Sequence, residues 1–117
     1  MQKLVIIFLL LSSTTCWALP QCRGTNASAW HNCEGTYKFS ENRDTDGTYT
    51  GEWRNGNFNG WGVYRWDNGA IYEGNWRNGK RYGYGKNRWN DGQIAIGEWA
   101  NDELNGQGSF YPNIYRS

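Results

Sequence analysis

Aromatic or glycine positions alternate with polar positions, with a period of two, along much of the chain beyond residue 48. Tyr49, Gly51 and Trp53 fall on one face of an extended segment, while Thr50 and Glu52 fall on the other. This period is typical of a β-strand that is covered on one side only. Further segments follow the same rule, with glycine again on the aromatic face, so we expect rings from adjacent strands to cover bare backbone there.

Turn signals separate the alternating segments. Asn55-Gly56 and Asn78-Gly79 predict tight hairpin reversals, because the central residues of such turns need positive φ. Asn68-Gly69 and Asp91-Gly92 predict the connections from one hairpin to the next. We therefore expect an all-β fold: an elongated, single-layer antiparallel meander of repeated β-hairpins, with no helix beyond the N-terminal apolar segment.

The hairpins repeat with a period of 23 residues. Tyr49 to Gly56 returns as Tyr72 to Gly79 and, more loosely, as Ala95 to Asp102. We predict three repeats at 48–70, 71–93 and 94–117, each covering its neighbour's apolar face. The third is irregular, since Asp102 replaces the turn glycine and Pro112 stands where an aromatic residue is expected. Terminal units of repeat arrays are commonly atypical.

The N-terminus has the pattern of a secretory signal peptide. One positive charge at Lys3 precedes an unbroken apolar run, Leu4 to Leu11, and small residues lead to Ala18. We predict a signal peptide over 1–18 and export to the periplasm or the extracellular space. The alternative is a membrane anchor retained by an uncleaved N-terminal segment, although the run is short for a bilayer span.

Residues 19–47 are expected to form an N-terminal cap with a degenerate half repeat. Gly35 to Phe39 resembles the second strand of a repeat, and Trp30 is placed to supply the missing half. Cys22 and Cys33 follow the predicted cleavage site, and disulfides persist in exported proteins, so we expect a structural bridge between them. His31 is the only histidine in the chain, which argues against a metal site.

Composition narrows the class of partner. The chain has 12 basic and 11 acidic residues, and loss of Lys3 would balance them. This balance argues against a nucleic-acid partner, because binding to phosphates needs an excess of Lys and Arg. Aromatic residues make up 17% of the chain and glycine numbers 16, whereas aliphatic residues become scarce after the signal peptide. Rings packed on glycine are therefore expected to replace an aliphatic core.

The residues resemble those of a known family, the MORN repeat proteins, whose unit is Tyr-x-Gly-Glu-Trp-x-Asn-Gly-Lys-x-x-Gly-x-Gly. Tyr72 to Gly85 follows this unit with Asn75 in place of Glu, and Tyr49 to Gly62 follows it with Asn57 in place of Lys. The signal peptide and the lead-in with Cys22 and Cys33 are similar to those of small exported bacterial members. The resemblance implies a single-layer hairpin array that acts in protein scaffolding, dimerisation or membrane association.

Catalysis is not expected. Glu52 and Glu98 occupy equivalent positions, but they belong to the first and third repeats. Two carboxyl groups that act on one glycosidic bond lie about 5 to 10 Å apart, whereas these are separated by four strand spacings of about 4.8 Å. His31, the only conventional base, lies in the predicted cap. A carbohydrate-active protein remains a distant alternative, and no cofactor is expected.

Two surfaces are candidates for binding. The first is the aromatic face, which could hold a peptide strand, stack sugars, pack on a second copy, or simply form the internal packing of the sheet. Its residues are Tyr49, Trp53, Tyr64, Trp66, Tyr72, Trp76 and Trp89. The second is a basic edge, which could meet anionic headgroups or acidic partners, or could merely be a solvated edge. Its residues are Arg77, Lys80, Arg81, Lys86 and Arg88.

These features predict a non-catalytic, exported MORN-repeat interaction module for protein–protein or cell-envelope scaffolding. The expected partner is an unidentified protein, or a second copy of the chain paired through a sheet edge. The alternative is binding to an anionic phospholipid surface through the basic edge.

Overall fold

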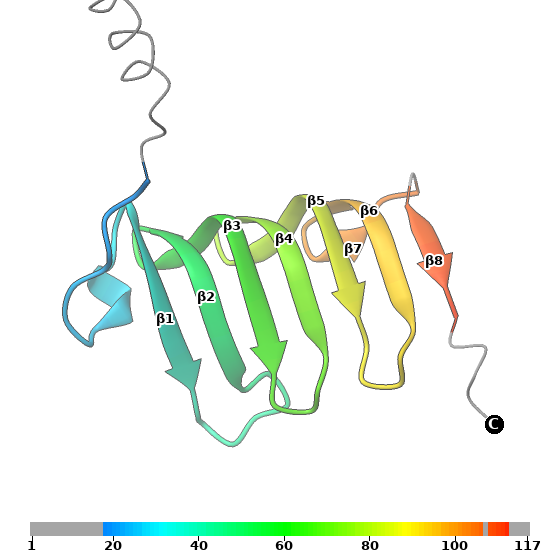
Figure 1. Ribbon diagram of the computed structural model, residues 1–117, viewed down its shortest axis with the longest axis horizontal. Coiled ribbons are helices and arrows are strands. Elements are labelled where there is room, and N and C mark those ends of the chain that lie inside the picture. Colours follow the sequence, from blue (N-terminus) through cyan, green and yellow to red (C-terminus); the bar gives the residue numbers. More distant parts are fainter. Residues whose placement is uncertain (1–17, 107, 113–117) are drawn as a thin grey trace, which may run out of the picture.

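The computed structural model describes residues 18–106 and 108–112. They form one open antiparallel sheet in a single layer, with the order β1-β2-β3-β4-β5-β6-β7 and β8 paired with β6 (Figure 1). The strands are β1 (Cys33–Phe39), β2 (Gly47–Arg54), β3 (Asn57–Trp66), β4 (Ile71–Arg77), β5 (Lys80–Arg88), β6 (Ile94–Ala100), β7 (Glu103–Leu104) and β8 (Ser109–Tyr111). The predicted single-layer meander of hairpins is confirmed.

Helical structure in the described part of the chain is confined to one three-residue 3-10 helix, η1 (Ala27–Ala29). Asn26 caps it, because its side-chain oxygen accepts from the backbone N–H of Ser28. The predicted signal peptide, 1–18, lies outside the described residues except for Ala18. No helix among the residues that the structure describes has the length and apolar character needed to cross a bilayer.

The hairpin turns adopt the backbone conformation that their sequences predict. Asn55 and Gly56 have φ values of 51° and 75°, and Asn78 and Gly79 have values of 50° and 81°. The first pair joins β2 to β3, which form the first hairpin, and the second pair joins β4 to β5, which form the second hairpin. Because Asn and Gly tolerate positive φ, the strands reverse within two residues.

A row of glycines crosses the middle of the sheet and brings strands and rings together. Gly51, Gly62, Gly74, Gly85 and Gly97 are paired in register from β2 to β6. A β-carbon at Gly62 would overlap the Tyr49 ring, and a β-carbon at Gly85 would overlap the Tyr72 ring; each ring comes from the preceding strand. The expectation that rings cover bare backbone is therefore confirmed, and glycine here is a packing requirement.

Tryptophans link successive hairpins through their indole N–H groups. Trp76 Nε1 donates to the Gly62 carbonyl at 3.1 Å, and Trp99 Nε1 donates to the Gly85 carbonyl at 3.0 Å. Trp53 Nε1 donates to the Gly35 carbonyl of β1 in the same way, at 3.0 Å. The N–H group of each buried indole is thus hydrogen-bonded to the backbone of the preceding unit, as buried polar groups require.

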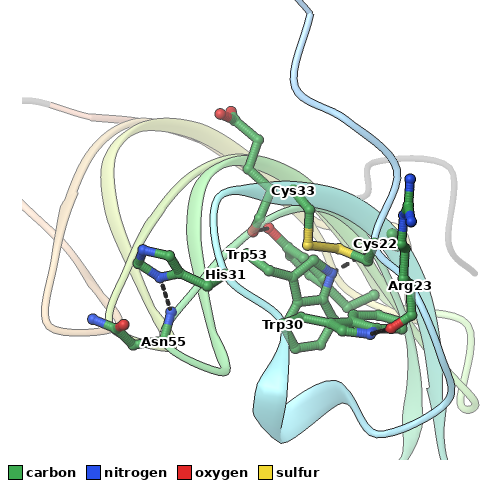
Figure 2. The surroundings of a disulfide bond; sticks show 10 residues. Cys22, Arg23, Trp30, His31, Cys33, Trp53 and Asn55 are labelled. Carbon is green, nitrogen blue, oxygen red and sulfur yellow. Dashed lines mark hydrogen bonds between the residues drawn. A yellow bond between two sulfur atoms is a disulfide. The ribbon is translucent and has the colours of Figure 1, made fainter.

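The N-terminal cap covers the outer edge of β1. Cys22 N donates to the Glu34 carbonyl, and Glu34 N donates to the Pro20 carbonyl, both at 2.8 Å. A disulfide joins Cys22 to Cys33, as predicted from the sequence (Figure 2). Trp30 is buried against Trp53 at 5.0 Å between ring centroids, so it closes the end of the aromatic face.

Candidate functional site

The aromatic face of the sheet is largely internal packing. Of the seven aromatic residues predicted to line it, five are buried: Tyr49, Trp53, Tyr64, Tyr72 and Trp76. Tyr49 and Tyr72 have no exposed surface, while Trp66 is partly buried. Trp89 is 37% exposed and contacts Phe110 at 6.0 Å, away from the other six. The face is therefore mainly the core of the protein, and only part of it is open to a ligand.

The buried tyrosines are held in their neutral form. The hydroxyls of Tyr49 and Tyr72 donate to the carbonyls of Glu52 and Asn75, at 2.9 and 3.1 Å. Burial raises the pKa of Tyr72 to about 12, although the charge of Arg81 opposes the increase. Burial also raises the pKa of Tyr49, and there the charge of Glu52 adds to the effect. These phenols act as hydrogen-bond donors and packing groups at neutral pH.

A groove of about 560 Å³ opens on the aromatic face. Aromatic and charged side chains line it in equal number, and the charged ones come from the β1–β2 loop and from the β4–β5 and β6–β7 hairpins. The aromatic residues that line it are Phe39, Phe58, Tyr64, Trp66 and Trp76, and the charged ones are Glu41, Arg43, Asp46, Arg81 and Asp102. Its volume falls within the range of ligand pockets.

Arg81 does not belong to the basic edge predicted from the sequence. Its side chain is only 20% exposed and lies over the Trp99 ring at 4.7 Å. Its Nε contacts Asp102 Oδ1 at 3.2 Å, and its Nη1 donates to Asn87 Oδ1 at 3.1 Å. This guanidinium is therefore committed to internal bonds on the aromatic face, because it occupies the position that Phe58 takes in the first hairpin.

The other four residues of the predicted basic edge do not form one patch. Arg77 and Lys80 pair beside the turn of the second hairpin, and Arg77 lies over the Tyr82 ring at 4.8 Å. Lys86 and Arg88 lie along β5 instead, and Lys86 is paired in register with Glu73. The positive charge is thus divided between two places, which weakens any attraction to a surface of uniform negative charge.

The comparisons with known proteins give the family. The sequence model of the MORN repeat matches residues 49–71, 72–94 and 96–113, more than half of the chain. The chain belongs to the MORN repeat family. A search of curated proteins found no match. MORN repeats generally mediate protein or membrane interactions and are typically non-catalytic.

The polar face of this MORN sheet carries exposed aromatic residues that the sequence analysis did not select. Trp61 is 48% exposed and Tyr84 is 54% exposed. They are 23 residues apart and occupy the middle of the Gly60-x-Gly62 and Gly83-x-Gly85 motifs. The period-two pattern places them opposite the glycine face, where a strand exposed to water usually carries polar residues. An aromatic residue at a position where a polar residue is expected was therefore the sequence signal that could have identified Trp61 and Tyr84.

The structure places the acidic and basic groups considered for catalysis far apart or in backbone hydrogen bonds. Glu52 lies on β2 and Glu98 on β6, so four strand spacings, about 19 Å, separate them. His31 Nδ1 accepts from the backbone N–H of Asn55 at 3.0 Å, beside the cap (Figure 2). Among the described residues, no group of three or more His, Cys, Asp and Glu side chains is placed to hold a metal ion.

Proposed function

We propose that this MORN protein is a non-catalytic, exported interaction module that binds a segment of a partner protein in the groove of its aromatic face. The observation that carries the proposal is the groove itself, because a lining of aromatic and charged side chains suits a peptide with both apolar and charged residues. Of the aromatic-face residues outside the groove, Tyr49, Trp53 and Tyr72 are buried in the sheet and Trp89 is partly exposed, so the groove is the part of that face most suited to a ligand.

Export to the periplasm or the extracellular space, as in small bacterial members, is part of the proposal. It is supported by the apolar run Leu4 to Leu11 and by the Cys22–Cys33 disulfide, which suits an oxidising compartment. Binding to an anionic phospholipid surface is the alternative. It has less support, because Arg81 is bonded internally and the other basic residues are divided between two places.

Photo-crosslinking in the producing cells tests the proposal. A photoreactive residue replaces exposed Thr45, which lines the groove, and in a second strain it replaces Glu98 on the polar face. We expect one protein to be captured from position 45 and not from position 98. Capture of lipid alone, or equal capture from both positions, would overturn the proposal.

Three variants separate the groove from the basic residues. Trp66→Ala removes a wall of the groove, and Trp89→Ala is its matched control, since Trp89 lies one repeat later and outside the groove. We expect only the first to lose the partner. Neutralising Arg77 and Lys80 should leave the partner bound, whereas loss of membrane recovery in that variant alone would favour the lipid alternative.

A further inference from the structure

Six side chains, one on each strand from β1 to β6, lie across the polar face, with β-bulges at Glu52 and Asn75. The register pairs Glu34 with Glu52, Trp61 with Asn75, and Tyr84 with Glu98, on successive strands from β1 to β6. Hydrogen bonds join the remaining neighbours. The row therefore alternates, from β2 to β6, between a polar side chain and an exposed ring.

We propose that this row, Glu34, Glu52, Trp61, Asn75, Tyr84 and Glu98, is a binding site for a neutral β-1,4-linked polysaccharide. The site is on the face opposite the groove and is independent of the proposed protein partner. An extended chain of sugars would run along the row, with its rings on the two aromatic residues and its hydroxyl groups on the carboxylates and the amide.

The two aromatic residues are not needed by the core. Trp61 and Tyr84 are exposed and lie on the face away from the buried rings. Exposed rings at the same position of two successive repeats make a patch that packing does not explain. The flat π face of an indole or phenol is electron-rich, so it attracts the polarised C–H groups on one side of a pyranose ring.

Two polar members of the row, Glu52 and Asn75, are held in place by backbone groups of the ring-bearing strands. Glu52 Oε2 accepts from the backbone N–H of Trp61 at 2.5 Å, and Asn75 Nδ2 donates to the Tyr84 carbonyl at 3.2 Å. These bonds restrict both side chains beside the rings. A carboxylate has about four acceptor positions, so Glu52 retains capacity for sugar hydroxyls.

The spacing of the rings selects the type of linkage. Trp61 on β3 and Tyr84 on β5 are separated by two strand spacings, roughly 10 Å. In an extended β-1,4-linked chain, every second sugar ring presents the same face, and two sugar rings span a similar length. The two aromatic residues therefore match alternate sugar units of one straight chain. A curved α-linked chain would lose contact with one of the two aromatic residues.

Charge selects a neutral ligand. The row carries three carboxylates, Glu34, Glu52 and Glu98, and no basic residue. A polyanion would be repelled along the row, while sugar hydroxyls donate to carboxylates without bringing a charge. Glu73 and Lys86, which are paired on the adjacent row, balance each other. A neutral hydroxyl-rich chain thus complements the site.

Titration calorimetry with cellohexaose and chitohexaose, at fixed salt, tests the assignment. We expect binding of at least one of them, with weaker binding of the disaccharides, which are too short to cover both rings. Maltohexaose, an α-linked hexasaccharide, should not bind. Failure of both β-1,4-linked hexasaccharides, equal binding of maltohexaose, or binding of alginate or anionic vesicles in their place would overturn the assignment.

Substitutions locate the binding on the row. Trp61→Ala and Tyr84→Ala should each weaken the β-1,4-linked hexasaccharide about tenfold, the equivalent of about 1.4 kcal/mol, and the double variant should abolish binding. Trp61→Phe should restore most of the affinity, and its unchanged thermal unfolding would confirm the fold. Phe110→Ala is the control, since Phe110 is 51% exposed and lies outside the row. Equal affinity of the double variant and the natural protein would also overturn the assignment.

Discussion

The first and second hairpins share a tyrosine at one core position and differ at the two core positions beside it. In the first hairpin, Tyr49 stacks on Phe58 at 3.9 Å between centroids, and Tyr64 lies beside Phe58 at 5.7 Å. The second hairpin has Tyr72, Arg81 and Asn87 at these positions. An aromatic stack and a polar cluster thus fill equivalent space, although the strand register and the glycine row are the same.

The polar cluster depends on a residue of the third hairpin, which is formed by β6 and β7. The aromatic stack, in contrast, is made by residues of the first hairpin itself. Asp102 occupies the turn position of Gly56 and Gly79, with φ of 69°. Its carboxylate accepts from the backbone N–H of Arg81 at 2.8 Å, and its carbonyl accepts from Arg81 Nη2 at 2.9 Å. The irregular turn that the sequence indicated is therefore stabilised from the preceding hairpin, which offsets the strain of positive φ at a non-glycine residue.

The largest difference between the hairpins should appear when equivalent tryptophans are removed. Trp76 contacts Tyr49, Phe58 and Tyr72 at 4.9 to 5.6 Å, whereas Trp99 lies between Tyr72 and the Arg81 guanidinium. We expect Trp76→Ala to lower the free energy of unfolding by about 3 to 5 kcal/mol, and Trp99→Ala by less. Urea titration followed by circular dichroism measures both. An equal loss would show that the stack adds nothing over the polar cluster.

Reduction of the disulfide should affect the first hairpin and leave the second unchanged. The Cys22–Cys33 bridge holds the cap over the β1 edge, and Trp30 packs on Trp53. We expect a loss of about 3 kcal/mol and the earliest proteolysis between Leu19 and Trp30. Limited proteolysis and hydrogen exchange with and without reductant test this, with Cys22→Ala/Cys33→Ala as the control. Equal protease resistance in both conditions would contradict the proposed role of the bridge.

The polar cluster should be strongly coupled. Arg81→Ala leaves Asp102 without its ion pair and leaves buried Asn87 without the donor that Arg81 Nη1 supplies, so we expect a loss of about 2 kcal/mol. Asp102→Gly suits positive φ and removes the carboxylate. In the Arg81→Ala background it should therefore cost less than it does alone. A double-mutant cycle in urea measures the coupling, and additive effects would mean that the two residues act separately.

Alkaline pH should lower the free energy of unfolding through the buried tyrosines of both hairpins. We expect the loss per tyrosine to be the smallest of the effects considered. Burial raises the pKa of Tyr49, Tyr64 and Tyr72 above the usual value of about 10. The unfolded chain then releases protons first, so stability is fully present below pH 10 and falls as the pH rises, towards about 12 for Tyr72. Tyr72 contributes about 1.4 kcal/mol per pH unit in that window.

Tyr→Phe variants test this titration separately in the two hairpins. Tyr49→Phe and Tyr72→Phe should each make the alkaline loss of stability shallower. Unfolding in urea at several pH values from 8 to about 11 provides the slopes. Identical slopes in the two variants and the natural protein would show that these phenols do not control the alkaline transition.

Much of the architecture could be predicted because the determinants are local and repeated. The period of 23 residues and the Asn-Gly pairs give the hairpins, and glycine at alternate positions gives the face that the rings cover. Cys22 and Cys33 gave the bridge, since they were the two cysteines left after the predicted cleavage. The predicted export, the repeat boundaries and the partner classes stay predictions.

The sites were harder to predict, because side-chain type alone did not reveal which face a residue occupies. Arg81 was grouped with Arg77 and Lys80 on the basis of charge, yet it is two positions from Gly83 and one repeat after Phe58, which places it on the glycine face. Trp61 and Tyr84 were missed for the opposite reason, since aromatic residues were expected on the covered face. Register, once known, corrects both assignments.

The bonds at the hairpin turns give the array a direction. The backbone N–H groups of Gly56, Gly79 and Asp102 donate to the carbonyls of Trp30, Phe58 and Arg81, each time toward the N-terminal neighbour. The turn amide of each hairpin therefore bonds to the unit before it. Because a ribosome releases the chain N-terminus first, the carbonyl that accepts each of these three bonds leaves the ribosome before the amide that donates to it.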